Sequence, residues 1–416
     1  MCRTRVITGL VLGLALGACS RPPATEPART PTAQNKDNDA ASALHRAAIV
    51  IDTHNDVTQR LIIQNVDLSK RLPDGQTDLP RMREGGLDAE FLSVFVLPML
   101  YPKERAHEQA LAQFDAIDKL VAANSSDVVL ARSTKDVRDA AAAGKTAFLI
   151  GVEGAHALGD ASDAELLQRL AGFYERGARY MTLSWSNSNR LGGSSGDDGK
   201  TLGLTPFGEQ VVLRMNELGM LVDISHVSDA TFFDAVRVSK RPVLASHSSA
   251  RALSDHPRNM TDDMLRAVRD NDGAVCVNFG PQFLDAAWSK QESALEARAE
   301  PELKALLGQA SADPRAAQAA MWQLFGKVAA SLPPVPASLV IDHIEHIARV
   351  AGVDHVCLGS DYDGIAVAPA GLDDVSKLPF VTRELLRRGF SASDVRKVLG
   401  ENVLRVLAAS ERHPPR

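Results

Sequence analysis

Eight short apolar runs, separated by amphipathic segments, constrain the fold of this chain more than any other feature. The segments between them, such as residues 106–123, 163–176 and 206–218, carry apolar residues at helical spacing. Such alternation predicts an α/β fold, the (β/α)8 TIM barrel, in which parallel strands form a closed ring surrounded by helices. The predicted strands are 48–51, 89–96, 147–152, 179–183, 220–224, 242–245, 273–278 and 355–358.

A long, alanine-rich helical segment, residues 281–336, interrupts this alternation after the seventh predicted strand. Residues 342–350 are then the predicted helix that leads to the eighth strand, and residues 391–407 form two closing helices with Ser391 or Ser393 as the N-cap. The inserted segment could cover a site or form an oligomeric contact, such as that of a homodimer. The sequence leaves both roles open.

The N-terminus has the features of an export signal. Arg3 and Arg5 precede an apolar run, residues 6–16, that is too short to span a bilayer comfortably. The sequence Leu-Gly-Ala-Cys at 16–19 then resembles a bacterial lipobox, in which the cysteine becomes the lipidated N-terminus. An ordinary secretory signal with cleavage nearby is the alternative.

The lipobox predicts three parts of the chain. Residues 1–18 are the signal peptide, residues 19–40 are a disordered tether that follows the lipidated Cys19, and residues 41–416 are the barrel domain. We therefore expect a protein of the bacterial cell envelope that is attached to a membrane by its lipid, at the periplasmic face of the outer membrane.

Composition excludes some partners and some uses of cysteine. The net charge is −6 and no basic run occurs, so we expect no nucleic acid partner. The four cysteines are too few and too scattered for a disulfide framework. The sequence contains no CxxC pair, which would be the sign of a structural zinc site. Cys276 and Cys357 lie in apolar runs, where we expect buried, inert thiols.

Residue types that bind metals follow five of the eight predicted strands. Each such residue alone is more often a cap or a hydrogen-bonded loop residue. Because the carboxyl ends of barrel strands meet at one rim, the set together favours a metal site. These residues are His54 and Asp56 after the first strand, Glu153 after the third, His226 after the fifth, His247 after the sixth and Asp361 after the eighth.

Mixed imidazole and carboxylate ligands suit zinc or a similar first-row ion. Alternate residues of an extended segment point the same way, so His54 and Asp56 can hold one ion. His226 and His247 suit a second ion, and the two oxygens of Glu153 could bridge the pair. Two ions about 4 Å apart can share and acidify a water, giving a hydroxide near neutral pH.

Asp361 and Arg258 predict the rest of the reaction. Asp361 could accept the proton of the attacking water and pass it to a leaving amine. The planar, always charged guanidinium of Arg258 suits a substrate carboxylate. Together with the metal ligands, these residues predict hydrolysis of an amide whose substrate ends in a free carboxylate.

The ordered motifs resemble the membrane dipeptidase (renal dipeptidase) family, zinc peptidases of the amidohydrolase superfamily. They span about 47–407 and include IDTHND at 51–56, GVEGAH at 151–156, DISHVS at 223–228, ASHSSARAL at 245–253, HPRNM at 256–260 and GSDYDG at 359–364. The resemblance implies a dipeptidase with two zinc ions that often tolerates a D-residue at the C-terminal position. It also implies that His54 and Asp56 bind the first zinc, that His226 and His247 bind the second, and that Glu153 bridges them. Asp361 is then the acid/base residue, and Arg258 is the clamp on the dipeptide carboxylate.

One position departs from the family pattern. Many members carry a histidine after the fourth strand that helps to hold the scissile carbonyl oxygen, and here Trp185 takes that place. An indole N–H can donate a hydrogen bond but cannot become cationic. Trp185 and Asn187 are therefore candidate substrate contacts, with Asn189 or Arg190 as other donors. The Gly- and Ser-rich loop 187–200 is predicted to be mobile.

Two other functions compete with a dipeptidase. An N-acyl-amino-acid deacylase on the same scaffold would fit the change at Trp185, and a non-catalytic surface lipoprotein could use the barrel for binding.

Other residues of these types are expected to have structural roles. We expect a plain hydrogen-bonding role for His156, a turn-shaping role for Asp363, orientation of the Arg258 loop by His256, and a solvated helix face for His343 and His346. The orientation of Asp223 stays open.

Overall fold

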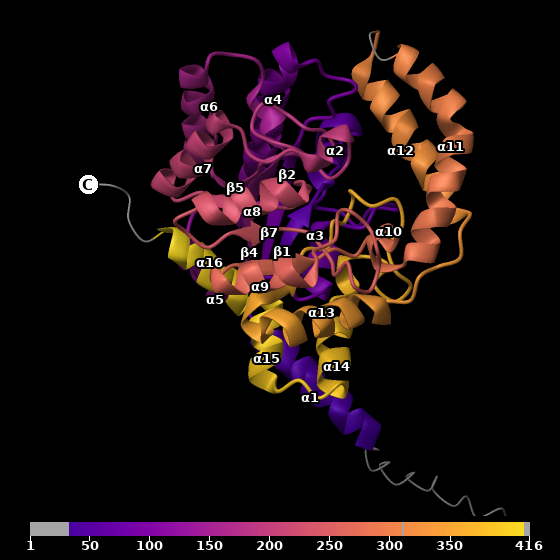
Figure 1. Cartoon of the computed structure of the whole chain (residues 1–416). Helices are drawn as coiled ribbons and strands as arrows, with labels where there is room; N and C mark the ends of the chain where they lie inside the picture. The colour runs from indigo at the N-terminus through magenta and orange to yellow at the C-terminus, as the bar shows by residue number, and fades with distance from the viewer. Residues whose placement is uncertain (1–32, 310–311, 412–416) are drawn as a thin grey trace, which may run out of the picture.

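The computed structural model describes residues 33–309 and 312–411. Eight parallel strands pair in the order β2-β1-β9-β8-β7-β6-β5-β4, and a further pairing of β2 with β4 closes the ring. Helices surround this ring, which confirms the predicted (β/α)8 barrel (Figure 1). The strands are β1 (Ile51–Asn55), β2 (Ala89–Phe95), β4 (Thr146–Glu153), β5 (Ala178–Thr182), β6 (Leu221–Asp223), β7 (Leu244–Ala245), β8 (Ala274–Val277) and β9 (Val356–Leu358).

Two strands differ from the prediction. A short strand, β3 (Val128–Leu130), pairs with β4 outside the ring, and the sequence pattern does not predict it. The predicted first strand, 48–51, begins three residues before β1 and overlaps it only at Ile51. The apolar pattern did not reveal residues 52–55 of β1, because these residues are polar and their hydrogen-bond partners belong to distant parts of the chain. Asp52 accepts a hydrogen bond from the backbone N–H of Ser360 at 2.7 Å, for example.

The outer helices begin and end close to their predicted bounds. In α7 (Pro206–Leu218), the Thr205 side chain caps the first turn and Gly219, at φ +81°, ends the helix in the left-handed region. The other helices around the ring are α2 (Val57–Ile63), α3 (Leu79–Glu84), α4 (Lys103–Ala123), α5 (Thr134–Ala142), α6 (Asp163–Glu175), α8 (Asp229–Val238), α9 (Asp262–Asp270) and α13 (Ser338–Ala351).

The core has two layers because successive strand residues face opposite sides. Along β2, Phe91 packs with residues of neighbouring strands inside the barrel, whereas Leu92 packs with the layer under the helices. Side chains of α16 (Asn402–Glu411), including Val403 and Leu407, join the inner layer. The C-terminal helix therefore closes one end of the barrel, and the carboxyl ends of the strands open at the other.

The segments that flank the barrel correct one boundary. Residues 33–40, predicted to belong to the disordered tether, lie in α1 (Ala33–Ala47). This helix packs against α14 (Pro379–Arg387), and His45 hydrogen-bonds the Thr382 hydroxyl at 2.7 Å and the Gly85 carbonyl at 2.8 Å. The predicted signal peptide and Cys19 lie outside the described residues. Within those residues, no helix is both long and apolar enough to cross a membrane.

The closing segment follows the prediction. Ser391 caps α15 (Ala392–Arg396), since its hydroxyl accepts the backbone N–H of Asp394 at 3.1 Å. A π-helical turn, Lys397–Glu401, joins α15 to α16.

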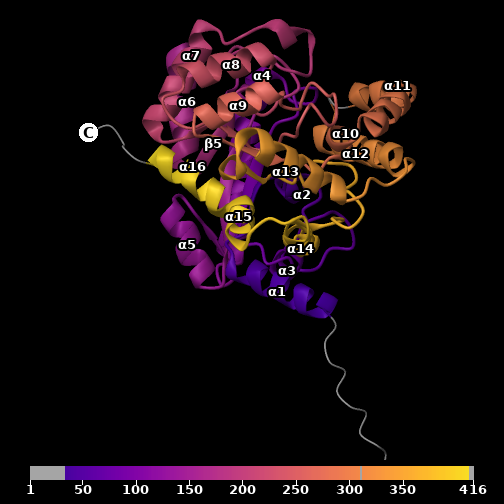
Figure 2. The ribbon, with the colours of Figure 1, turned by 60° about the horizontal axis from the view of Figure 1, so that its bottom comes forward.

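The inserted segment is helical, as predicted. It contains α10 (Pro281–Leu284), α11 (Ala286–Gln309) and α12 (Pro314–Ala330). Helices α11 and α12 lie side by side and project from one side of the barrel, as Figure 1 and Figure 2 both show. Trp288 anchors the base of this hairpin, because its buried indole donates a hydrogen bond to the Pro333 carbonyl at 3.0 Å.

A disulfide joins Cys276 on β8 to Cys357 on β9, so the prediction of two free, inert thiols is wrong. The two cysteines are directly paired in the register of the parallel strands, and both are fully buried. They are separated by 81 residues that include the whole insertion. Only the pairing of β8 with β9 brings them together, and spacing in the sequence gives no sign of it.

We expect the double variant C276A/C357A to lose about 2–4 kcal/mol of unfolding free energy, because a cross-link over a loop of this size restricts the unfolded chain. Urea unfolding monitored by circular dichroism measures the change. Reductant added during unfolding should destabilise the wild type by a similar amount and leave the double variant unchanged. A wild-type midpoint that does not respond to reductant would contradict the prediction.

Candidate active site

The carboxyl end of β1 supplies the first pair of predicted ligands. His54 is fully buried, and its Nε2 lies 3.3 Å from Oδ2 of Asp56. On the other side of the ring, the Tyr180 hydroxyl lies 2.8 Å from His54 Nδ1 and donates its own proton to the Thr53 carbonyl. The hydroxyl therefore accepts the Nδ1–H, which turns Nε2 of His54 toward Asp56.

Tyr180 reaches His54 only because a glycine stands opposite. Tyr180 is fully buried on β5, and a Cβ placed at Gly151 on β4 would lie 1.9 Å from its Cζ. Any larger residue at 151 would displace the ring that holds His54. The motif GVEGAH thus combines a metal-ligand candidate, Glu153, with the space that orients another.

Glu153, at the end of β4, lies between two groups of imidazole nitrogens. Its Oε2 is 3.5 Å from His54 Nε2, and its Oε1 is 3.0 Å from His226 Nε2 and 3.6 Å from His247 Nε2. Burial raises the pKa of Glu153, but the three histidines lower it by more, so that the net pKa lies well below the usual range. The carboxylate is ionised and presents one oxygen to each group.

His226 and His247 follow β6 and β7, and their Nε2 atoms are 3.0 Å apart. His247 Nδ1 lies 2.7 Å from the Ser246 hydroxyl, which donates to Asp223 at 2.7 Å, so this hydroxyl accepts the Nδ1–H of His247. Burial and Arg258 lower the pKa of His226 to about 3. Burial likewise holds the pKa of His247 well below its usual value. Both rings are neutral, as metal ligands must be.

Asp223, whose orientation the sequence leaves open, points inward and supports this arrangement. It also accepts hydrogen bonds from the backbone N–H groups of Ser225 at 3.1 Å and Ser246 at 2.9 Å. Asp223 is fully buried. It orients His247 through Ser246, and a partner of this kind beyond the ligands typically tunes metal binding.

The buried polar atoms of the site fit a bound cation. In the described part of the chain, His54 Nε2 and Asp56 Oδ1 are buried without a hydrogen-bond partner. Imidazole nitrogens and carboxylate oxygens converge here, and the carboxylates repel one another unless positive charge lies between them. Neutral imidazole nitrogens with carboxylate oxygens are a donor set that zinc accepts.

Asp361 lies after β9, with its backbone at φ +64°. Asn278 donates a hydrogen bond to its Oδ2 at 2.8 Å, while its Oδ1 lies 4.0 Å from His54 Nε2. Burial raises the pKa of Asp361 to about 8, a shift that a bound cation would oppose. Gly364 leaves room for it, since a Cβ there would lie 2.4 Å from Asp361 Oδ1. The carboxyl group therefore stands beside the ligands and can exchange a proton.

Arg258 is buried at the same rim. Its guanidinium donates to the Ser248 hydroxyl at 3.3 Å and to the His247 carbonyl at 3.1 Å, whereas its Nε has no hydrogen-bond partner among the described residues. His256 Nδ1 accepts the backbone N–H of Arg258 at 3.1 Å, which confirms that His256 orients this loop. Arg258 thus presents a positive charge to the cavity described next.

A cavity of about 310 Å³ is lined by three of the ligand candidates together with Asp361 and Arg258. Its barrel side is lined by Asp56, Glu153, Trp185, His226 and Asp361, among others. Its other side comes from the insertion, through Gln282, Phe283, Glu292, Glu296, Trp322 and Phe325. Of the two roles that the sequence leaves open for this segment, the structure shows that it covers the site.

The two predicted substrate contacts, Trp185 and Asn187, line different cavities. Trp185 lines the cavity, with its ring centroid 4.8 Å from that of Phe95. Asn187 lines a neighbouring cavity instead, next to Asn189 and Arg190. Asn189 donates to the Leu183 carbonyl and Arg190 to the Ala161 carbonyl, so both are already engaged.

The loop predicted to be mobile is held by an aspartate. Asp197 accepts a hydrogen bond from the Ser188 hydroxyl at 2.7 Å and one from the backbone N–H of Gly199 at 2.9 Å. Ser194 and Ser195 in the same loop are buried. The high glycine and serine content of the loop therefore permits tight turns that its own side chains cap.

The remaining histidines take structural roles. His343 and His346 are buried, so the predicted solvated face is wrong. His343 Nδ1 accepts the backbone N–H of Ala250 at 3.0 Å, and His346 Nε2 lies 2.7 Å from Asp262. His156 Nε2 lies 2.7 Å from the Val96 carbonyl, the plain hydrogen bond that was expected. Residues of α9, of α10 and of the loop at Ala250 pack on this face of α13, and helical periodicity does not reveal such contacts.

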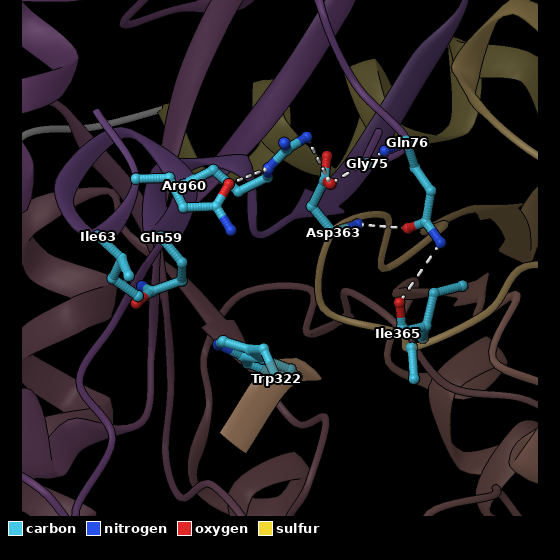
Figure 3. Close-up of a pocket in the computed structure, with 10 residues that line it drawn as sticks. Gln59, Arg60, Ile63, Gly75, Gln76, Trp322, Asp363 and Ile365 are labelled. Carbon is cyan, nitrogen blue, oxygen red and sulfur yellow. Dashed lines mark hydrogen bonds and ion pairs between the residues drawn. The ribbon is translucent and has the colours of Figure 1, made fainter. Parts of the chain in front are cut away.

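Asp363 shapes a turn, as expected. It lies at φ +61°, and its Oδ1 accepts the backbone N–H of Gln76 at 3.0 Å and lies 3.6 Å from Arg60 (Figure 3). Trp322 of α12 lines the pocket beside this turn and also lines the cavity of the metal ligands. The insertion therefore packs directly next to the GSDYDG loop.

Sequence reasoning missed the residues that orient the ligands. Tyr180, Ser246 and Asn278 all lie on or beside predicted strands, but their residue types are common there. The cavity-lining residues of the insertion were also missed. A weak signal exists for Ser246 alone, which directly precedes His247.

The fold and this donor set define a metal-dependent hydrolase built on a (β/α)8 barrel. The family model for membrane dipeptidase (peptidase family M19) matches residues 38–414. The chain belongs to the membrane dipeptidase family.

Several solved structures are similar over almost their whole length. The probable dipeptidase PvdM from Pseudomonas aeruginosa is 26% identical, with a TM-score of 0.77, over 91% of this chain and 99% of that one. The metallopeptidase dipeptidase AC is 28% identical, with a TM-score of 0.70, over 87% and 98%. A metallopeptidase from Rhodobacter sphaeroides, liganded with a phosphinate mimic of the dipeptide L-Ala-D-Ala, is 27% identical, with a TM-score of 0.70, over 87% and 99%.

Proposed function

We propose that the protein is a binuclear zinc dipeptidase that accepts a D-residue at the C-terminal position. One observation carries the proposal. The two oxygens of Glu153 lie nearest different imidazole nitrogens, Oε2 nearest His54 and Oε1 nearest His226 and His247. With Asp56 beside His54, this arrangement suits one zinc ion on each side and Glu153 between them.

Zinc held there would supply Lewis acidity that activates water and polarises an amide carbonyl. The chain's own groups would perform the other tasks. Arg258 would bind the C-terminal carboxylate of the dipeptide and so place its peptide bond over Glu153. Asp361, held by Asn278, would take the proton of the attacking water on its carboxylate and hand it to the leaving amine.

The stereochemical part of the proposal rests on a relative. The Rhodobacter sphaeroides structure holds a phosphinate mimic of L-Ala-D-Ala, so that relative binds a ligand of this stereochemistry. In the present chain, Arg258 and the ligand candidates Asp56, Glu153 and His226 line one cavity. We therefore expect L-Xaa-D-Xaa dipeptides to be substrates.

The test combines metal content with substrate choice. The purified chain is analysed for bound zinc and assayed with L-Ala-D-Ala and with N-acetyl-D-alanine, before and after chelation. Two zinc ions per chain with chelator-sensitive cleavage of the dipeptide would support the proposal. Cleavage of only the acyl substrate would assign a deacylase instead, and a zinc-loaded protein that cleaves neither would support a binding function.

For Arg258→Ala we expect the KM for dipeptides to rise by about 10- to 100-fold, because a charge-assisted contact to the substrate carboxylate is lost. Steady-state kinetics on L-Ala-D-Ala measures this rise. The same reaction on the C-terminal amide of the dipeptide is the control, since its KM should change little. An unchanged KM for the free dipeptide would remove Arg258 as the clamp.

We also propose that the protein is exported and anchored through a lipid on Cys19 at the periplasmic face of the outer membrane. The lipobox supports this proposal, and so does the buried Cys276–Cys357 disulfide, because such bonds persist mainly in oxidising compartments. Membrane fractionation tests it. Wild type should sediment with membranes and Cys19→Ser should not, and equal distribution of the two would exclude the anchor.

A further inference from the structure

The side of the cavity opposite the barrel carries an acidic pair that the proposed reaction does not use. Glu292 and Glu296 are four residues apart on α11 and line the cavity together. Glu292 is half-buried, and Glu296 is more exposed. Like charges at this spacing destabilise a helix, and burial together with Glu296 raises the pKa of Glu292 to about 8. The doubly ionised form of the pair is therefore disfavoured as long as nothing positive lies beside it.

The chain provides no such partner for these two residues. Among the described residues, the groups that shift the pKa values of Glu292 and Glu296 include no basic side chain. Glu300 on the same helix differs, since Lys304 pairs with it at 2.7 Å. Within the described part of the chain, the two glutamates that line the cavity therefore lack a basic partner, whereas Glu300 on the same helix has one. A cationic ligand could take the place of that missing partner.

The rest of the cavity supports the same ligand. Its aromatic side chains suit an alkyl chain with a cationic end, because cations are attracted to aromatic faces and methylene groups pack on them. These side chains are Phe95, Trp185, Phe283, Trp322 and Phe325. Arg258, buried at the barrel side with its Nε lacking a hydrogen-bond partner among the described residues, attracts a carboxylate at the other end.

We propose that Glu292 and Glu296 form a subsite for a cationic side chain of the substrate, so that the enzyme prefers dipeptides that contain a lysine-like residue. This inference rests on the proposed dipeptidase function. The α-ammonium group of a dipeptide lies one carbon from the scissile carbonyl, and it therefore stays near Asp56, Glu153 and Asp361 at the barrel rim. A long side chain is what can cross the cavity to the insertion.

The test compares L-lysyl-D-alanine with L-norleucyl-D-alanine, which has a neutral side chain of similar length. We expect kcat/KM of the wild type to favour the lysyl substrate by about tenfold, the scale of one desolvated cation contact. In E292Q/E296Q this ratio should fall to within about twofold of unity. Glu300→Gln, on the outside of the same helix, is the matched control and should keep the wild-type ratio.

Each outcome has a distinct meaning. Equal rates on both substrates in the wild type would overturn the subsite and leave the dipeptidase function intact. A variant that weakens both substrates equally would assign the glutamates to the α-ammonium group and also overturn it. If the wild type hydrolyses neither substrate, the subsite is tested by calorimetry, which measures the binding of the same two dipeptides to the zinc-loaded protein. Tighter lysyl binding that E292Q/E296Q abolishes supports the subsite, and equal binding refutes it.

Discussion

Asp361→Asn should retain bound metal and lose turnover by about 100- to 10,000-fold, because the amide cannot take up the proton that a carboxylate at this position would carry. The carboxyl group is well placed for proton transfer. It lies 4.0 Å from His54, is held by Asn278 at 2.8 Å, and has its pKa raised to about 8 by burial. Asparagine has nearly the same shape and can keep a hydrogen bond to Asn278.

The measurement is kcat on L-Ala-D-Ala at saturation, together with zinc per chain by elemental analysis. Asp373→Asn, an exposed aspartate in the loop that follows, is the matched control and should keep full turnover. Normal turnover in Asp361→Asn would refute the acid/base role. Loss of zinc along with turnover would instead assign Asp361 to the ligands.

Glu153→Gln should reduce bound zinc from two ions per chain to one or fewer. The substitution removes the negative charge and replaces one oxygen by an NH2 group, which cannot bind a metal and would face either His54 or the His226–His247 pair. Because metal that binds only the folded state stabilises it, we also expect a lower melting temperature in the presence of zinc.

Elemental analysis and differential scanning calorimetry test this expectation without any activity assay. Glu165→Gln, on the exposed surface of α6, is the control and should match the wild type in both. Chelated wild type and chelated Glu153→Gln should melt closer together than their zinc-loaded forms, since the difference comes from the bound metal. Two full equivalents of zinc in Glu153→Gln would overturn the bridging role.

Several features of this protein follow from local sequence. Apolar strands and amphipathic helices can be recognised from hydrophobic periodicity, which is why α6 and α7 lie close to their predicted bounds. The ligand candidates could also be predicted, because the carboxyl ends of barrel strands share one rim whatever the details of packing. His54, Asp56, Glu153, His226 and His247 are indeed brought together there.

Other features depend on contacts between distant segments. The strand β1 could not be recognised from hydrophobicity, because its polar residues find hydrogen-bond partners on β5 and just after β7 and β9 only when the ring closes. Local sequence also fails to predict the burial of His343, the Cys276–Cys357 disulfide and the placement of Asn187 in a separate cavity. No periodicity records such contacts, since each depends on the register of elements far apart in the chain.

The sequence by itself therefore determined the barrel, the rim that carries the ligands and the helical nature of the insertion, since hydrophobic periodicity and strand order act locally. Only the tertiary structure decided which residues orient the ligand candidates at that rim and which segment covers the cavity. Tyr180 orients His54 from another strand, Asp223 orients His247 through Ser246, and the insertion folds over the cavity with Glu292 and Glu296. These are long-range contacts, and their physical basis is the packing of segments that the chain order keeps apart.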